Sequence, residues 1–534
     1  MPAWLKDAVF YEIYPQSFCD TNGDGIGDFQ GIIDKLDYIK NLGCNALWIN
    51  PCYDSPFKDA GYDVRDYKKT APRYGTNEDL VRLFDEAHAK GIHVLLDLVP
   101  GHTSEEHPWF RESQKAEKNE YTDRYIWTEH CFKGTFGHPY VAGESDRSGA
   151  YMLNFFKCQP ALNYGFLHPT QNWQQSMEDP GPIATKEAIK DVIRFWLDKG
   201  CDGFRVDMAD SLVKEDDEQK TGTCRIWSDV RRMLDRDYPE AAFVSEWSRP
   251  DLSIPAGFHM DFLLNGFNRP YTYLARDYDN HGVDTVLNGG FRDGRPADWV
   301  IDRSYFKKDS GGSIRSFLNL YEQYYAQTKD IGYMSFISCN HDTYRPSLNL
   351  DDTERRLFMA FLLTMPGVPF IYYGDEIGMR YLQIPTKEGG YFRTGSRTPM
   401  QWNAGPNLGF STADPADIYL PVDPSEDAPT VESQMADPSS IYHTVKDVLA
   451  LRHANEDLQA DAPFESLYAE DTEPLYLYRR GSLILGVNPS SQERSVPLPK
   501  TFLGTHIEVL YQYGKASCDG ARVTVAPQSF VVLK

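Results

Sequence analysis

Short apolar runs rich in β-branched and aromatic residues recur through the first 380 residues of the chain. They lie at 8–14, 46–50, 93–99, 203–207, 243–246, 335–338 and 370–376. Between several of these predicted strands, apolar residues recur with the period of an amphipathic helix, as at 31–43, 77–91 and 185–200. About eight such strand–helix units over more than 350 residues predict an α/β fold, a parallel sheet closed into a (β/α)8 TIM barrel. An open doubly wound sheet would usually carry a glycine-rich nucleotide loop, which we do not find.

Two departures from this alternation predict further domains. After the third strand, the stretch 103–169 is rich in aromatic residues, Gly and His without a helical period, which predicts an inserted subdomain. From about residue 460 the pattern changes to short alternating strands separated by turns, which predicts a C-terminal antiparallel β-sandwich domain over 460–534. The catalytic barrel then comprises 1–102 and 170–459, with the sixth strand at 256–264.

Composition and charge exclude several classes of protein. With 41% hydrophobic and 25% charged residues among 534, the chain resembles a soluble globular protein, and no apolar run approaches the roughly 18 residues of a membrane span. The net charge of −24 repels phosphates and anionic lipids, so we expect a small-molecule partner rather than nucleic acid or a membrane. Nine cysteines without paired spacing and an N-terminus without a secretion signal predict reduced thiols and a cytoplasmic location. The oligomeric state stays open.

Barrel enzymes carry their chemistry at the carboxyl ends of the strands, and polar residues recur there in this sequence. They are Asp97 and His102 after the third predicted strand, Arg205 and Asp207 in the fourth, Glu246 in the fifth, and His341 and Asp342 after the seventh. Singly, a strand-end Asp can cap a helix, and an Arg–Asp pair can be a buried salt bridge. Together, converging carboxylates suit cleavage of a glycosidic bond, in which one attacks the anomeric carbon and another protonates the leaving oxygen.

Six motifs in order carry a resemblance to a known family. They are DLVPGHTS from Asp97, GFRVD from Gly203, VSEW from Val244, SCNHD from Ser338, GVPFIYYGDEIGM from Gly367 and RTPMQW from Arg397. The set resembles the α-amylase superfamily, glycoside hydrolase family thirteen, and more closely its oligo-1,6-glucosidase and α-glucosidase branch. The resemblance covers essentially the whole chain. It implies a retaining exo-acting α-glucosidase that releases terminal α-linked glucose from small oligosaccharides or α-glucosides by double displacement, without an organic cofactor.

The resemblance also implies the role of each site residue. Asp207 would be the nucleophile, Glu246 the general acid/base and Asp342 the stabiliser of the transition state, with the two catalytic carboxyl groups about 5 Å apart. The residues implied to bind substrate are Asp59, Tyr62, His102, Phe155, Arg205, His341 and Arg397.

Other positions indicate exo rather than endo action. Starch-cleaving endo-enzymes of the family carry a Lys-His pair where this chain has Asp210 and Ser211. Exo-glucosidases bind the terminal glucose through residues that match Asp59 and Arg397, with Arg393 as a second candidate for the arginine.

Four departures from the family pattern limit these expectations. Gly101 stands where the family usually has Asn, which puts the interdomain calcium of many amylases in doubt, and Ala161 replaces an acidic residue. Ala60 replaces a common Asn, and Met208 follows the implied nucleophile, where smaller residues distinguish 1,6-preferring from 1,4-preferring members. The linkage preference therefore stays open.

The loop 20–28, DTNGDGIGD, spaces its oxygen-bearing side chains like the start of an EF-hand. Gly31 stands where the bidentate Glu would be and the loop follows a strand, so this is no EF-hand, and spacing alone leaves a solvated turn equally open. The resemblance implies a structural Ca²⁺ here. Its implied ligands are Asp20, Asn22, Asp24, the Ile26 carbonyl and Asp28.

Two alternatives to hydrolysis remain. A transglycosylase or isomerase would use the same glucosyl-enzyme intermediate and differ in acceptor binding and water exclusion. A non-catalytic sugar-binding protein of this fold would have lost the nucleophile or the acid/base, and both Asp207 and Glu246 are present.

Overall fold

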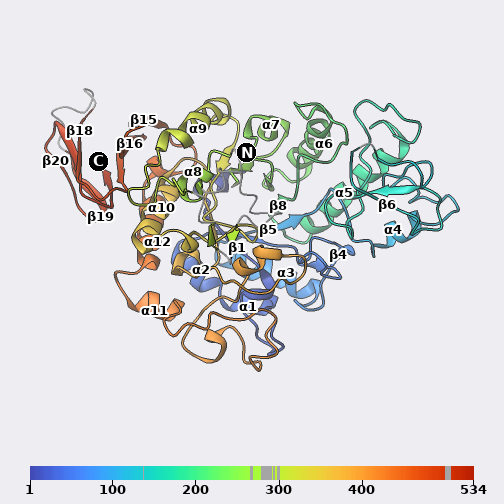
Figure 1. Cartoon of the computed structure of the whole chain (residues 1–534), viewed down its shortest axis with the longest axis horizontal. Helices are drawn as coiled ribbons and strands as arrows, with labels where there is room; N and C mark the ends of the chain where they lie inside the picture. The colour runs from blue at the N-terminus through green and yellow to red at the C-terminus, as the bar shows by residue number, and fades with distance from the viewer. Residues whose placement is uncertain (136, 265–268, 278–290, 293–294, 297–300, 499–506) are drawn as a thin grey trace.

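Eight parallel strands form the centre of the molecule in the computed structural model, which describes residues 1–534 except 136, 265–268, 278–290, 293–294, 297–300 and 499–506 (Figure 1). They are β1 (Phe10–Ile13), β2 (Ala46–Ile49), β5 (His93–Leu98), β8 (Gly203–Val206), β9 (Ala242–Ser245), β10 (Met260–Phe262), β13 (Tyr333–Ser335) and β14 (Phe370–Tyr372). Their order is β13-β10-β9-β8-β5-β2-β1-β14, and a parallel bridge between Ile337 and Phe370 joins the two ends into a ring. The predicted (β/α)8 barrel is confirmed, with β10 inside the predicted sixth strand.

Helices surround this ring. The longer ones are α3 (Asn77–Ala89), α5 (Pro180–Leu197), α6 (Thr221–Asp237), α9 (Ile314–Thr328), α10 (Asp352–Thr364) and α12 (Ile441–Ala454). Shorter ones are α7 (Pro250–Ala256), α8 (Thr272–Ala275) and α11 (Val431–Ala436). The helix predicted at 31–43 is divided into α1 (Phe29–Asp34) and α2 (Leu36–Leu42), because Lys35 leaves helical geometry with ψ near 1°.

The segment between β5 and α5 leaves the barrel and forms the cyan part of Figure 1. It contains α4 (Pro108–Ser113) and the antiparallel pair β6 (Tyr140–Ala142) and β7 (Ala150–Met152). Two further short pairs are β3 (Tyr53–Asp54) with β4 (Asp66–Thr70), and β11 (Phe291–Arg292) with β12 (Arg295–Pro296). The inserted segment returns to the barrel through a bridge between His102 and Ala161.

Two antiparallel sheets follow α12 and form the C-terminal part, drawn in red in Figure 1. One contains β15 (Phe464–Glu470), β16 (Glu473–Arg480), β17 (Leu483–Asn488), β22 (Ser529–Leu533) and β19 (Val509–Tyr513). The other contains β18 (Arg494–Pro497), β21 (Arg522–Val525) and β20 (Ala516–Cys518). The predicted C-terminal antiparallel β domain is confirmed, while the residue boundaries of the three domains stay a prediction.

The barrel strands explain the continuous apolar runs of the sequence. Every residue of β1, β2, β8, β9 and β14 is buried, as expected for parallel strands covered on both faces. The backbones approach closely at Gly203, where an added Cβ would lie 1.9 Å from the Ala242 carbonyl oxygen. All nine cysteines are unpaired, and no helix in the described part of the chain is long and apolar enough to cross a membrane.

Candidate active site

A cavity of about 240 Å³ opens at the carboxyl ends of the barrel strands. Asp207 follows β8, Glu246 follows β9, and Asp342 follows β13, so three strands deliver one carboxylate each. The wall consists of Asp59, Tyr62, His102, Phe155, Asp207, Met208, Glu246, Leu264, Asn340, Asp342, Thr343 and Arg393. The volume lies slightly below the lower end of common ligand pockets, about 300 Å³, which suits a group the size of one sugar ring.

One buried guanidinium organises the floor of this cavity. Arg205 donates through Nη1 to Asp207 Oδ1 at 2.9 Å and to Asp97 Oδ1 at 3.0 Å, and its Nη2 lies 2.8 Å from Glu246 Oε2. The guanidinium also lies 5.0 Å from the ring centroid of Trp48. Because β5, β8 and β9 are adjacent and parallel, the three carboxylates meet at one arginine.

Burial sets the protonation of these carboxyl groups. It raises the pKa of Glu246 to about 7; Arg205 opposes this rise, and the nearby carboxylates of Asp207 and Asp342 add to it. Burial also raises the pKa of Asp207, against the attraction of Arg205. The site therefore holds acidic groups that can exchange a proton near neutral pH, as general acid–base catalysis needs.

The backbone of Met208 completes the surroundings of Glu246. Its N–H donates to Glu246 Oε2 at 3.0 Å, and its φ of +41° lies in the left-handed region that non-glycine residues rarely occupy. Such local strain is common where a backbone group is aimed at a functional side chain.

Asp342 on the opposite wall is held ionised. Its Oδ1 accepts from Arg393 Nη1 and Arg397 Nη2, both at 2.8 Å, and its Oδ2 lies 3.2 Å from His341 Nε2. Burial acts to raise its pKa, but His341 and the two arginines outweigh burial and hold the pKa well below its usual range. The other ring nitrogen of His341, Nδ1, lies 3.0 Å from Glu12 Oε1.

His341 is correspondingly charged. Burial disfavours its charged form, but Asp342 and Glu12 outweigh burial and raise the pKa of His341 to about 9. The carboxylates of Asp342 and Glu12 therefore share the imidazolium of His341.

The structure divides the predicted substrate-binding residues into two groups. Four of them line the cavity: Asp59, Tyr62, His102 and Phe155. Three lie behind its wall, each at most 2% exposed: Arg205, His341 and Arg397. Of the two candidate arginines, Arg393 lines the cavity, while Arg397 lies behind it and donates to the His341 carbonyl.

Asp59 and Arg393 meet at one end of the cavity. Arg393 Nη2 lies 3.6 Å from Asp59 Oδ1, and Gln159 from the inserted segment donates to Asp59 Oδ2 at 2.7 Å. Burial raises the pKa of Asp59, and Arg393 opposes that rise. The pair places two oppositely charged groups in the cavity wall.

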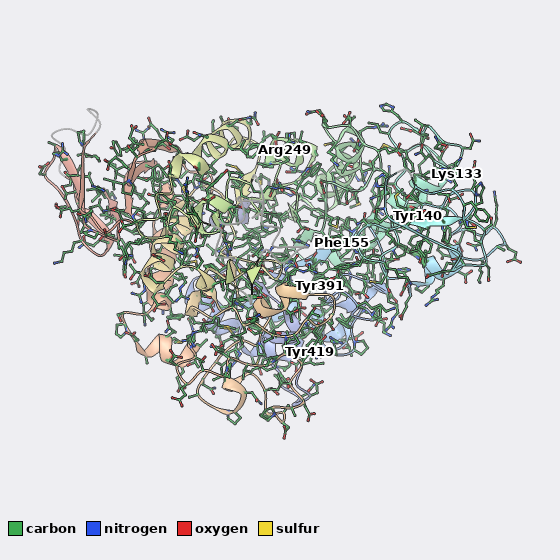
Figure 2. The ribbon with its side chains drawn as sticks, in the orientation of Figure 1. Lys133, Tyr140, Phe155, Arg249, Tyr391 and Tyr419 are labelled. Atoms are coloured by element: carbon green, nitrogen blue, oxygen red, sulfur yellow. The ribbon has the colours of Figure 1, made fainter. Side chains whose placement is uncertain are left out.

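Two aromatic side chains, Tyr62 and Phe155, form a further part of the wall. The Tyr62 ring stacks on His341 with 5.3 Å between centroids, and its hydroxyl donates to Asp97 Oδ2 at 3.0 Å. Phe155 contacts Phe156 at 4.4 Å between centroids, and Phe156 in turn contacts Tyr391 at 6.3 Å. Figure 2 shows Phe155 and Tyr391 near the centre of the molecule, where the inserted segment meets the barrel.

Sequence reasoning missed three residues that hold site histidines in place. Glu12 contacts His341, and Asn154 contacts His102 and accepts a hydrogen bond from Lys214. Glu12 lies in β1, where a buried charge among apolar residues was a usable signal. Asn154 and Lys214 lie in loops and carried no such signal, because their partners are distant in the sequence.

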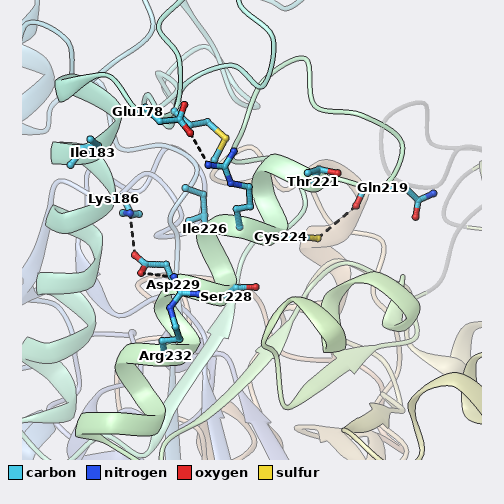
Figure 3. A pocket seen from close by; sticks show the side chains of 12 residues that line it. Glu178, Ile183, Lys186, Gln219, Thr221, Cys224, Ile226, Ser228, Asp229 and Arg232 are labelled. Carbon is cyan, nitrogen blue, oxygen red and sulfur yellow. Dashed lines mark hydrogen bonds and ion pairs between the residues drawn. The ribbon is translucent and has the colours of Figure 1, made fainter.

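A larger cavity of about 620 Å³ lies between α5 and α6, outside the predicted site (Figure 3). Its charged residues pair with one another, Glu178 with Arg225 at 2.7 Å and Lys186 with Asp229 at 3.1 Å. None of the predicted site residues is among its described wall residues. Size therefore does not identify the functional cavity in this chain.

The loop 20–28 directs its side-chain oxygens toward its own backbone. Asp20 accepts from the N–H groups of Gly23 and Gly25, each at 2.8 Å, and Asp28 caps α1 by accepting from Gly31 at 2.7 Å. Within the described residues, no three His, Cys, Asp or Glu side chains gather as a metal cluster. Carboxylate and amide oxygens suit Ca²⁺. The four acceptor sites of Asp20 are occupied by the N–H groups of Asn22, Gly23 and Gly25 and by the Ser411 hydroxyl, so a cation would have to replace some of these hydrogen bonds.

Comparison with known proteins identifies the family. Residues 12–461 match the model of the α-amylase catalytic domain. The chain belongs to the α-amylase family of glycoside hydrolases. An oligo-1,6-glucosidase of Heyndrickxia coagulans is 33% identical over 95% of this chain and 96% of its own length. A trehalose synthase/amylase of Mycobacterium tuberculosis is 32% identical over 92% of this chain and 82% of its own length.

A solved structure agrees with these relatives. The trehalulose synthase MutB of Pseudomonas mesoacidophila superposes with a TM-score of 0.78 at 25% identity, over 100% of both chains. The resemblance to the α-amylase family and its oligo-1,6-glucosidase branch is thereby confirmed.

In this α-amylase family member, Arg205→Met should remove the cation shared by the carboxylates of Asp97, Asp207 and Glu246. We expect a loss of about 3–5 kcal/mol of unfolding free energy at pH 8, measured by urea denaturation. Without Arg205 the pKa values of Asp97, Asp207 and Glu246 in the folded state rise further above their unfolded values of about 4. As the pH falls from 8 toward 4, these groups become protonated and no longer repel one another, so the loss of unfolding free energy should shrink.

The matched control is Arg225→Met, which breaks an exposed pair with Glu178. It should cost less than about 1 kcal/mol and show little pH dependence. Equal losses for the two variants at pH 8 would contradict the organising role of Arg205.

Proposed function

We propose that this protein is a retaining, exo-acting α-glucosidase that hydrolyses terminal α-linked glucose from small oligosaccharides or α-glucosides. The observation that carries the proposal is the single buried Arg205, which holds Asp207 and Glu246 at the same face of a cavity suited to one sugar ring. Ionised Asp342 on the opposite wall supplies negative charge to a ring that becomes cationic in the transition state.

The reaction proceeds in two displacements. Asp207 Oδ1 accepts from Arg205, so we assign the attack on the anomeric carbon to Oδ2. Glu246 Oε2 accepts from Met208 N–H and lies beside Arg205, so we assign the proton to Oε1. This proton goes to the glycosidic oxygen as its bond to carbon breaks. Water then attacks the glucosyl–Asp207 ester and returns a proton to Glu246.

The pair of Asp59 and Arg393 supports the proposed exo action. Both side chains line the cavity, lie 3.6 Å apart and can hydrogen-bond the hydroxyls of a terminal ring. We assign the arginine role to Arg393, since it lines the cavity and Arg397 lies behind it.

A second candidate is glucosyl transfer or isomerisation through the same intermediate. The names of a trehalose synthase/amylase and a trehalulose synthase among the similar proteins favour it. The distinction lies in whether a sugar or water attacks the ester, so it is decided by product analysis over time with maltose, isomaltose, trehalose and sucrose.

Asp207→Asn should abolish turnover, because an amide cannot form the glucosyl ester. We expect a fall of more than about 10⁴-fold in kcat on 4-nitrophenyl α-glucoside, with the fold retained by circular dichroism. Asp191→Asn, the same change at an exposed carboxylate, should leave kcat unchanged. Activity of Asp207→Asn within tenfold of wild type would refute the nucleophile.

Glu246→Gln should remove the general acid. For a disaccharide we expect kcat to fall by about 10²–10⁴-fold, and much less for a nitrophenyl glucoside, whose leaving group needs no proton. With a pKa of Glu246 near 7, wild-type kcat/KM on a disaccharide should fall as the pH rises above about 7, because the acid loses its proton. Glu240→Gln, an exposed control, should keep the fall of kcat/KM above pH 7. If Glu246→Gln lowered kcat equally on the disaccharide and on the nitrophenyl glucoside, the assignment of Glu246 as the general acid would be wrong.

We also propose that the loop 20–28 binds Ca²⁺ in a structural role, through the oxygens of Asp20, Asn22, Asp24, Ile26 and Asp28. Calcium at 100 times its dissociation constant should stabilise the protein by about 2.7 kcal/mol and raise the melting temperature, with kcat at 25 °C unchanged. Asp24→Asn should reduce the shift, while Asp146→Asn, an exposed control, should not. An unchanged melting temperature with calcium and with a chelator would exclude the site.

A further inference from the structure

Asn154 from the inserted segment joins three parts of the barrel beside the active-site cavity. Lys214 Nζ donates to its Oδ1 at 2.8 Å. Its Nδ2 lies 3.0 Å from His102 Nδ1 and 3.7 Å from Met208 Sδ. His102 and Met208 both line the cavity, so this amide touches the cavity wall from behind at two points.

Gly101 makes room for this amide. A Cβ at position 101 would lie 2.8 Å from Asn154 Nδ2, closer than side-chain atoms pack, and the amide is held by its contacts on both ends. The sequence departs from the family pattern at Gly101, where Asn is usual. The structure thus supplies an amide at this place from a different segment of the chain.

The orientation of the amide follows from its partners. The Lys214 ammonium has donors only, so the oxygen of Asn154 must face it and the NH₂ group must face His102. His102 Nδ1 is therefore an acceptor without a proton. Its Nε2 lies 3.1 Å from the Tyr62 carbonyl oxygen, which is an acceptor, so Nε2 carries the proton.

We propose that Asn154, oriented by Lys214, is a positioning residue that keeps His102 neutral and in its Nε2–H form in the wall of the glucose cavity. A neutral ring suits the proposed reaction, because a further positive charge in the cavity wall would disfavour the positive charge that develops on the sugar ring in the transition state. Both ring nitrogens are engaged by protein groups, so the ring is also fixed in rotation.

The groups around His102 are compatible with this role. Burial lowers the pKa of His102 to about 3, and the Lys214 ammonium lowers it further. Burial also lowers the pKa of Lys214 to about 8, so the ammonium that orients the amide persists at neutral pH. The Tyr67 hydroxyl donates to the His102 carbonyl, and the carboxyl groups of Asp59, Asp207, Glu246 and Asp342 line the same cavity as the ring.

The decisive variant is Asn154→Asp, which keeps the shape and the Lys214 contact but replaces the NH₂ donor by an acceptor. His102 must then take a proton at Nδ1 to face the carboxylate. In protein labelled with ¹⁵N-histidine, with the signal assigned by its loss in His102→Gln, we expect wild-type His102 to stay in the Nε2–H form from pH 5 to 7, where Lys214 is charged. In Asn154→Asp both nitrogens should be protonated at pH 6.

The kinetic readout rests on the proposed function, whereas the spectroscopic one does not, so the two can fail separately. We expect Asn154→Asp to lower kcat/KM on 4-nitrophenyl α-glucoside by about tenfold at pH 6, with a new ionisation in the pH profile. Asn172→Asp, the same charge change at an exposed site in the loop that follows the inserted segment, should reproduce the wild-type profile. A His102 signal in Asn154→Asp that still shows the neutral Nε2–H form at pH 6 would overturn the proposal.

Discussion

The site depends on placing one guanidinium, Arg205, in the interior of a barrel. A buried charge costs several kcal/mol unless it is paired and hydrogen-bonded, and here three carboxylates from three adjacent strands surround it. The arrangement also limits how far the surrounding carboxyl groups ionise. Three negative groups share one positive charge, so a proton is retained among them near neutral pH. The ion pairs that stabilise the buried Arg205 therefore also bring together the carboxyl groups that retain a proton, as the proposed general acid requires.

Charge is distributed unevenly around the cavity. On one wall burial raises the pKa of Glu246, and the carboxylates that outnumber Arg205 add to this rise. On the opposite wall Arg393, Arg397 and His341 outnumber Asp342, which keeps that carboxylate ionised. Two groups of the same chemical type thus differ in protonation because of their neighbours. Preorganised charge of this kind favours a cationic transition state without reorganisation during the reaction.

The barrel alone does not complete the cavity. Phe155 in its wall, Asn154 behind it and Gln159 on Asp59 all come from the segment inserted after β5. The insertion therefore shapes one end of the proposed glucose site, while the barrel strands supply the carboxylates that we propose to react. This division matches the general separation in barrel enzymes between a rigid scaffold and variable loops.

Local periodicity determined much of this protein. Buried parallel strands read as continuous apolar runs, so the barrel and the strand-end residues Asp207, Glu246 and Asp342 could be located from the sequence. A local sequence pattern does not show which distant residues come into contact. The choice of Arg393 over Arg397 as a wall residue and the link from Lys214 through Asn154 to His102 depend on segments that are far apart in the sequence. Tertiary structure decided these points, because the direction of a side chain in a loop is set by the partners it meets after folding.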